Sequence, residues 1–228
     1  MFLFNKMDRQ IIATEDGSHT LWVPELNEHF HSMHGAIQES VHVFISNGLE
    51  QVKTEELVLF EVGFGTGLNA LLTLIHQTQR SIRYISIEKY PLQEKEYSRL
   101  NYSSLLGPEW QTLFFKMHQA EWNRTTEIRP GFSLQKIKGD LAELNYTNLP
   151  RFNLIYFDAF APGKQPEMWD EKILRQLAAH TREEGHFTTY CAQGEVRRRL
   201  SRCGFQMHRI PGPPGKREML VGEKRSET

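Results

Sequence analysis

Short apolar runs alternate with stretches of helical spacing along most of the chain. Residues 57–62 form a mostly apolar run that a glycine follows, which is typical of a buried parallel strand. Leu68, Leu71, Leu72 and Ile75 then recur at helical spacing, so the pattern predicts a helix over 67–77. The same pattern predicts further strands at 82–87, 132–137, 152–157, 185–190, 205–210 and 218–221, and further helices at 91–106, 108–127, 167–180 and 195–202.

This alternation predicts an α/β fold with a doubly wound, mainly parallel sheet. The short hairpin around the Pro/Gly loop at 211–215 predicts one antiparallel strand at the end of the sheet. The first 50 residues are less regular, and apolar runs at 20–23 and 41–45 predict short strands there. We therefore expect an N-terminal extension over 1–50 that packs on a main domain over 51–228.

Composition narrows the class of protein. Of the 228 residues, 39% are hydrophobic and 24% are charged, which is the balance of a soluble globular chain with a sizeable core. No apolar run is long enough to span a membrane, and residues 1–8 lack the features of a signal peptide. Cys191 and Cys203 make neither a disulfide framework nor a zinc site, so we expect a cytoplasmic protein.

Charge is distributed unevenly although the net charge is only −1. Residues 13–61 hold nine acids and one base, whereas residues 196–228 hold nine Lys/Arg and three Glu. This C-terminal basic block is either a solvated helix face or a phosphate-binding patch. The arginines at 197–199 point in different directions around a helix, so only some of them could reach one ligand.

A glycine turn follows the first strand of the main domain. Gly63, Gly65 and Gly67 let the backbone turn sharply and approach a ligand at a helix N-terminus. Their spacing is Gly-x-Gly-x-Gly, not the Gly-x-Gly-x-x-Gly of dinucleotide sites. Glu61 precedes the turn, and its carboxylate would repel a pyrophosphate but attract the ammonium and sulfonium of S-adenosylmethionine.

Two further acids follow the next strands of the predicted sheet. Glu88 lies 21 residues after Gly67, where a carboxylate can accept hydrogen bonds from ribose hydroxyls. Asp140 follows the third strand and could accept a hydrogen bond from the adenine amino group. Either acid alone could be a helix N-cap. With Glu61, however, they place acids at three consecutive strand ends, which predicts a cofactor site.

A fourth acid, Asp158, follows a buried strand in the sequence Asp-Ala-Phe-Ala-Pro-Gly-Lys. The segment is similar to the Asp/Asn-Pro-Pro-aromatic motif of enzymes that methylate amino groups on bases. The alternative is an N-cap for the following helix.

Several segments together resemble a known family. They are 61–69, 158–162 with 166–169, and 215–219, with N-terminal support from 17–21, 28–36 and 39–44. The chain resembles the MnmD type of tRNA methyltransferase, which is also the methyltransferase half of the bifunctional MnmC enzymes, over about residues 14–223. The glycine turn is shared by many methyltransferases, whereas Asp-Ala-Phe-Ala-Pro and Gly-Lys-Arg-Glu-Met are more specific.

The resemblance implies a Rossmann-like class I methyltransferase that uses S-adenosylmethionine. Its implied reaction is methylation of the 5-aminomethyl group of (2-thio)uridine 34 in the tRNA anticodon. No counterpart of the MnmC oxidase half is found, so a separate enzyme would supply the aminomethyl group. The implied site has Asp158 as the catalytic residue, Glu61, Gly63, Gly65, Gly67, Asn69, Glu88 and Asp140 at the cofactor, and Phe30, Phe160, Lys164, Trp169, Lys216 and Arg217 at the RNA.

Alternatives remain at this point. A methyltransferase acting on a small amine fits the near-zero net charge. A nucleotide-cofactor oxidoreductase fits poorly because of Glu61 and the glycine spacing, and a non-catalytic RNA-binding module does not need the four acids. Five histidines, His19, His29, His31, His34 and His42, fall in the N-terminal part, but neither cysteines nor an acid cluster accompany them. We therefore expect no metal and expect these histidines to line a pocket or lie on the surface.

Overall fold

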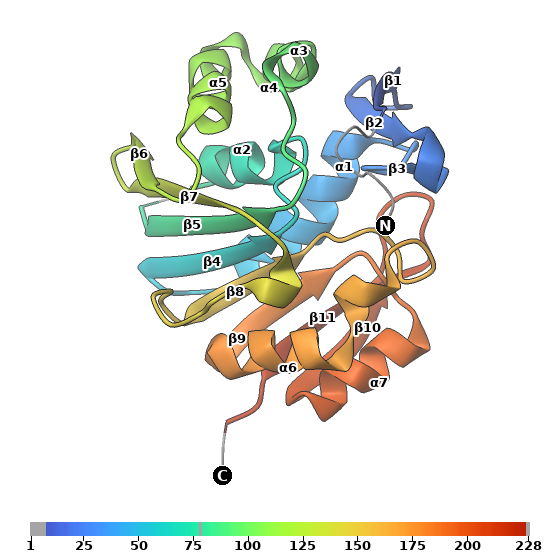
Figure 1. Cartoon of the computed structure of the whole chain (residues 1–228), viewed down its shortest axis with the longest axis vertical. Helices are drawn as coiled ribbons and strands as arrows, with labels where there is room; N and C mark the ends of the chain where they lie inside the picture. Colours follow the sequence, from blue (N-terminus) through green and yellow to red (C-terminus); the bar gives the residue numbers. More distant parts are fainter. Residues whose placement is uncertain (1–7, 78, 227–228) are drawn as a thin grey trace.

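The centre of the molecule is an eight-stranded sheet with the order β10-β11-β9-β8-β4-β5-β7-β6 (Figure 1). The computed structural model describes residues 8–77 and 79–226. The five strands from β9 to β7 are parallel, while β11 runs antiparallel to β9 and β10 antiparallel to β11. The α/β class with a mainly parallel sheet is therefore confirmed. The strands are β4 (Glu56–Val62), β5 (Ser81–Glu88), β6 (Thr125–Arg129), β7 (Phe132–Lys138), β8 (Phe152–Phe157), β9 (Thr181–Thr189), β10 (Phe205–Pro211) and β11 (Glu218–Lys224).

Helices cover both faces of this sheet (Figure 1). The strands bury both faces because successive side chains point to opposite sides. In β4, Leu59 packs in the cluster with α2 and α5, and Phe60 packs in the cluster with α6 and α7. The helices are α1 (Ala36–Ser40), α2 (Leu68–Ile75), α3 (Glu94–Tyr97), α4 (Tyr102–Leu106), α5 (Gln111–Gln119), α6 (Glu171–His180) and α7 (Gly194–Arg202).

The N-terminal segment forms a separate small antiparallel sheet of β1 (Gln10–Ala13), β2 (His19–Val23) and β3 (Glu28–His29). Hydrogen bonds fix it to the segment around α4. The amide of His19 donates to Asn101 Oδ1 at 2.9 Å, and Tyr102 OH donates to the His19 carbonyl at 2.7 Å. The extension therefore lies against the α3–α4 side of the molecule.

The strand expected at 41–45 is wrong, because Val41–Ser46 is a π-helix that continues α1. Val43, Phe44 and Ile45 are all buried, so no alternation separates a strand from a helix in this short apolar run. The helix packs on the sheet, and the ring centroids of Phe44 and Tyr156 lie 5.0 Å apart. Packing against the sheet overrides the strand preference of its β-branched residues.

The middle of the chain differs from the sequence prediction in two further places. The helix expected over 91–106 is two short helices, α3 and α4. The helix expected over 108–127 ends at Gln119, and β6 then pairs antiparallel with β7. Only Ile128 is buried in β6, so this edge strand carries little apolar signal.

Cys191 and Cys203 are both free and buried in the cluster with α6 and α7. In the described ranges, no helix combines the length and apolar character needed to cross a bilayer. The expectation about a signal peptide rests on residues that lie mostly outside the described part of the chain.

Candidate functional site

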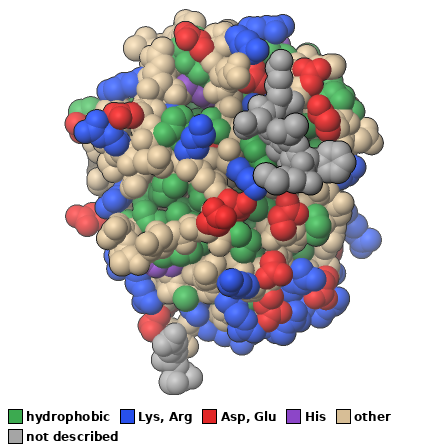
Figure 2. All heavy atoms as spheres, viewed as in Figure 1, with side chains coloured by type: hydrophobic (Ala, Val, Ile, Leu, Met, Phe, Trp, Pro, Cys, Tyr) green, Lys and Arg blue, Asp and Glu red, His purple; other side chains and the backbone are tan. Residues whose placement is uncertain are grey.

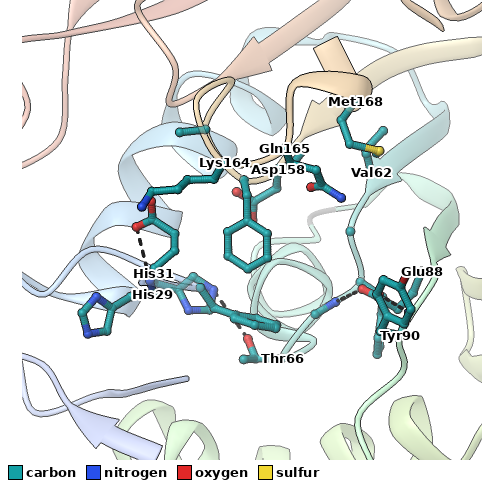
Figure 3. A pocket seen from close by; sticks show the side chains of 18 of the residues that line it. His29, His31, Val62, Thr66, Glu88, Tyr90, Asp158, Lys164, Gln165 and Met168 are labelled. Atoms are coloured by element: carbon teal, nitrogen blue, oxygen red, sulfur yellow. Dashed lines mark hydrogen bonds between the residues drawn. The ribbon is translucent and has the colours of Figure 1, made fainter. Parts of the chain in front are cut away.

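A cavity of about 510 Å³ lies at the carboxyl ends of the central strands. These ends belong to β4, β5, β7 and β8, and the strand order reverses at β4, where open α/β sheets bind their ligands. The N-terminal extension closes the other side of the cavity through Phe30 and His31. Figure 3 shows side chains from both parts of the chain around this one space.

The glycine turn between β4 and α2 lines the cavity with backbone. Gly63, Gly65 and Gly67 have φ values of 90°, 49° and 72°, which glycine adopts without strain. A Cβ at Gly67 would lie 2.9 Å from Nε2 of His118, and one at Gly63 would lie 3.1 Å from the carbonyl oxygen of Asp158. Larger residues would therefore disturb both the turn and the neighbouring acid.

Glu88 lies at the end of β5 and faces the cavity (Figure 3). Its Oε2 accepts the Gly65 amide at 3.0 Å, and its Oε1 accepts the Tyr90 amide at 2.7 Å. The carboxylate thus holds the glycine turn to the second strand. It lies where the sequence predicts an acceptor for ribose hydroxyls.

Asp140 lines the cavity after β7 and also caps a short 3-10 helix. Its Oδ1 accepts the Ala142 amide at 2.9 Å, and its Oδ2 lies 2.6 Å from Nζ of Lys89. Burial opposes ionisation, but these hydrogen bonds outweigh it, so the pKa of Asp140 lies below its ordinary value. Both sequence interpretations of this acid, the cap and the cavity residue, describe its position.

Glu61 is placed differently from the expectation. It is 1% exposed, and the cavity lining does not include it. Burial raises its pKa to about 8, so at neutral pH the carboxyl is mostly uncharged. Ser86, Tyr84 and Asn69 lie around the carboxyl and lower its pKa, but by less than burial raises it. Glu61 lies outside the cavity lining, and its attraction to the cofactor stays a prediction.

Asp158 follows β8 and lines the cavity with its carboxyl group (Figure 3). Nδ2 of Asn69, in the first turn of α2, donates to its Oδ2 at 2.8 Å. Burial raises the pKa of Asp158 to about 7, Glu39 raises it further, and Asn69 and Lys216 lower it. Asp158 does not cap the helices that follow it, because Gln165 is at the N-cap of the 3-10 helix Pro166–Trp169 and Asp170 is at the N-cap of α6. An acid with a pKa near neutrality can exchange a proton with a bound amine.

Phe30 and Phe160 pack against each other in the cavity lining. Their rings meet edge to face, with centroids 5.4 Å apart, and both line the cavity. Lys164 lines it as well, but its Nζ donates to the carbonyls of Leu26 and Asn27 at 2.9 and 3.3 Å. Lys164 therefore ties the Asp158 loop to the N-terminal extension.

Trp169 lies outside the cavity, contrary to the expectation that it stacks on a base. It is fully buried against Phe157, with ring centroids 4.6 Å apart. Its Nε1 donates to the Phe160 carbonyl at 2.8 Å. Trp169 thus supports the loop that carries Phe160 and presents no free ring face.

Lys216 lies inside the cavity rather than on an outer basic face. Its Nζ is 2.6 Å from Oε1 of Glu39 and 3.9 Å from the ring centroid of Tyr190. The next residue, Arg217, is exposed, and its side chain has no polar partner among residues 8–77 and 79–226. The two adjacent bases therefore differ in their surroundings.

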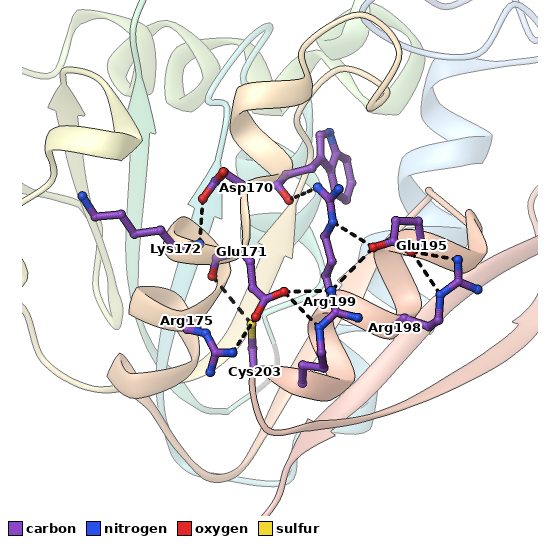
Figure 4. Close-up of polar contacts among 10 residues, drawn as sticks. Asp170, Glu171, Lys172, Arg175, Glu195, Arg198, Arg199 and Cys203 are labelled. Atoms are coloured by element: carbon purple, nitrogen blue, oxygen red, sulfur yellow. Dashed lines mark hydrogen bonds and ion pairs between the residues drawn. The ribbon is translucent and has the colours of Figure 1, made fainter.

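Much of the C-terminal basic block is already paired with acids (Figure 4). Glu195 binds Arg198 and Arg199, while Glu171 binds Arg202. In Figure 2, basic and acidic side chains are interspersed over α6 and α7. This favours the solvated helix face over a phosphate-binding patch for the α7 part of the block.

Several cavity residues escaped the sequence analysis, among them Arg9, Glu39 and Tyr190. His31, one of the five N-terminal histidines, also lines the cavity. Burial lowers the pKa of His31 to about 4, so the ring is neutral at pH 7. Glu39 lies within an apparently ordinary amphipathic segment, and no sequence signal separates it from a surface acid. Within the described ranges, no three His, Cys, Asp or Glu side chains are grouped to hold a metal.

The chain is similar to known proteins over most of its length. A family model described as S-adenosyl-L-methionine-dependent methyltransferase matches residues 105–225, more than half of the chain. The chain is 32% identical over 95% of its length to the tRNA 5-methylaminomethyl-2-thiouridine biosynthesis bifunctional protein MnmC of Burkholderia multivorans. It is 33% identical over 92% of its length to the MnmC protein of Cupriavidus metallidurans.

The chain spans about a third of these relatives, 35% and 33% of their lengths respectively. Among solved structures, MnmC2 of Aquifex aeolicus superposes with a TM-score of 0.76 and 24% identity. The match covers 99% of this chain and 73% of that one, which supports the fold. The glycine turn, the acids at the strand ends and the matched family model lead to one conclusion. The chain belongs to the family of S-adenosyl-L-methionine-dependent methyltransferases.

Proposed function

We propose that this protein transfers a methyl group from S-adenosylmethionine to the 5-aminomethyl group of (2-thio)uridine 34 in tRNA, giving the 5-methylaminomethyl product. The observation that carries the proposal is Asp158, a cavity acid with a pKa of about 7, held by Asn69 beside the glycine turn. The MnmC relatives, whose names refer to 5-methylaminomethyl-2-thiouridine in tRNA, supply the substrate. With tRNA as substrate, we also propose a cytoplasmic location.

The residues around the glycine turn fit the cofactor. The backbone of Gly63 and Gly65 is open to the cavity, and Glu88 and Asp140 offer carboxylate oxygens on one side of it. Glu88 would hold the ribose and Asp140 the adenine end. When bound, the cofactor supplies an electrophilic methyl carbon.

The acceptor amine needs a free lone pair before it can attack. An alkylammonium ion titrates near ~10, so it is mostly protonated at neutral pH. Asp158 can draw in the cation and accept one proton at its carboxylate, and Asn69 fixes the orientation of that carboxylate. Phe30 and Phe160 line the cavity, and a base that has left its stack could contact their rings there.

We assign residues 51–228 to the methyltransferase domain and residues 1–50 to an extension that completes its active site. Phe30 and His31 support this division, because they line the cavity from the extension. Lys164 joins the two parts through the carbonyls of Leu26 and Asn27.

The deciding experiment is methyl transfer from labelled S-adenosylmethionine to purified tRNA. We expect label in tRNA that carries 5-aminomethyluridine and none in the same tRNA with an unmodified uridine 34. A panel of small primary amines is assayed in parallel. Transfer to small amines but not to the modified tRNA would contradict the proposal and favour a small-molecule methyltransferase.

A further inference from the structure

Glu39 and Lys216, which line the same cavity as Asp158, form an ion pair. Oε1 of Glu39 lies 2.6 Å from Nζ of Lys216, and Oε2 of Glu39 accepts the Ser32 amide at 2.6 Å. Glu39 is 6% exposed and comes from α1, whereas Lys216 comes from the loop between β10 and β11. The pair therefore joins segments 177 residues apart across one side of the cavity.

Tyr190 connects this pair to the Asp158 loop. Its ring faces Nζ of Lys216 at 3.9 Å, and its hydroxyl donates to the carbonyl of Ala159 at 2.9 Å. Ala159 is the residue directly after Asp158. The ammonium, the ring and the loop are thus held in a fixed relation within the wall of the cavity.

We propose that Glu39 and Lys216 are positioning residues that set the basicity of Asp158, Glu39 making it a stronger base and Lys216 limiting that effect. The reason is Coulombic: a nearby negative charge favours the protonated carboxyl, and a nearby positive charge favours the carboxylate. A base for an ammonium substrate works best when its pKa is close to the working pH. This inference rests on the proposed function, because an amine acceptor is what gives the tuning its purpose.

Other titratable groups also face this part of the cavity. Glu61 interacts with Asp158 from β4, His31 interacts with Glu39 and Lys216 from the extension, and Cys191 interacts with Lys216 after β9. His31 is neutral above a pH of about 4. These residues are unchanged in the variants below. Because Glu39 and Lys216 also shift the pKa of His31, and Lys216 shifts that of Cys191, the comparison uses the signal of Asp158 alone.

The test measures the pKa of Asp158 directly in the free protein. The chain has only five aspartates, so carbon-13 labelling of aspartate carboxyls gives few signals, and Asp158→Asn identifies the relevant one. We expect Glu39→Gln to lower the pKa of Asp158 and Lys216→Met to raise it, each by about half a unit or more. The double variant should return toward the wild-type value, and it also avoids leaving a buried charge unpaired.

Arg209→Met is the matched control, because it breaks an ion pair with Glu218 on the same hairpin and leaves the cavity lining intact. It should leave the pKa of Asp158 unchanged. If the ion pair only held the two segments together, Glu39→Gln and Lys216→Met would shift the pKa of Asp158 in the same direction. Shifts in the same direction, or no shift in either variant, would overturn the proposal.

The titration needs neither RNA nor cofactor, so its outcome is independent of the substrate assay. If the tRNA is methylated, the same variants should move the acidic limb of the rate profile in the same opposite directions. Opposite pKa shifts without tRNA methylation would support the effect of the ion pair on Asp158 but contradict the proposed tRNA substrate. Methylation of the tRNA without opposite pKa shifts would support the proposed substrate but contradict the effect of the ion pair on Asp158.

Discussion

The side-chain amide of Asn69 donates to Oδ2 of Asp158 across 2.8 Å. Asn69 lies in the first turn of the helix that follows the glycine turn, and Asp158 follows the neighbouring strand. The helix that follows the glycine turn and the cavity acid Asp158 therefore form one hydrogen-bonded unit. A change in either half should be felt in the other.

Asp158→Asn should lower the rate of methyl transfer at saturating cofactor by roughly 10²–10⁴-fold, the usual scale for an acid–base group. The amide keeps the shape but cannot accept the ammonium proton. Raising the pH should partly restore the rate, because more of the amine is then neutral. Single-turnover transfer over a range of pH measures this.

Asp170→Asn serves as the control, because Asp170 caps α6 and is absent from the cavity lining. It should keep the wild-type rate. A near-normal rate for Asp158→Asn at neutral pH would show that the charge of Asp158 is dispensable. An equal loss at every pH would favour positioning of the neutral amine over proton removal.

Glu88→Ala should weaken cofactor binding by about 1–3 kcal/mol, because ribose hydroxyls would lose a charged acceptor. The same change frees the amides of Gly65 and Tyr90, which loosens the glycine turn. Calorimetry with S-adenosylmethionine and with its demethylated product measures the loss. Glu94→Ala, an exposed acid on α3, is the control, and equal affinities for both variants would refute the assignment.

Arg217→Ala should weaken tRNA binding and reduce its salt dependence by about one released counterion. Its exposed side chain has no polar partner among the described residues and lies next to the cavity residue Lys216. Arg198→Ala is the matched comparison, since Arg198 is exposed but bound to Glu195. Binding measured over a salt series should separate them, and identical slopes would point to another RNA-binding face.

His118→Gln should make folding less sensitive to acid. Burial lowers the pKa of His118 to about 3, whereas an unfolded histidine titrates near 6.5. Between those values the unfolded chain binds more protons, so this group reduces stability as pH falls, by up to about 1.4 kcal/mol per unit. Glutamine does not titrate and can still donate to the Thr66 carbonyl, which lies 3.0 Å from His118 Nε2.

The pKa values of Glu61 and Asp158 are raised by burial, so these groups act in the opposite direction over part of the same range. The informative quantity is therefore the difference between the unfolding free energies of variant and wild type. As the pH falls from 6.5 to 4, the stability advantage of the wild type over the variant should shrink or reverse. A constant difference would show that His118 does not titrate in this way.

The sequence predicts best those features that depend on local order along the chain. Glu88, Asp140 and Asp158 each follow an apolar strand, so parallel pairing alone brings them to one edge. The positions of Trp169 and Lys216 depend instead on which way a side chain turns and on contacts with distant segments. Lys216 contacts Glu39, which lies 177 residues away in the sequence, and a local pattern cannot predict such a contact.

The same reasoning explains the errors in the fold. In Val41–Ser46, three consecutive residues, Val43, Phe44 and Ile45, are buried. The apolar pattern of this segment therefore fits a π-helix and a strand equally well. β6 buries only Ile128, so its pairing with β7 decides its conformation rather than its own composition. In both segments the tertiary contacts outweigh local preference.

The two buried thiols give the protein an internal reporter. Burial raises the pKa of both Cys191 and Cys203, so little thiolate is present to react with an alkylating reagent at neutral pH. Both thiols lie in the core cluster with α6 and α7, on one face of the sheet only. The rate of alkylation should therefore measure how fast the core around α6 and α7 opens. It should not measure the opening of the core that packs on α2.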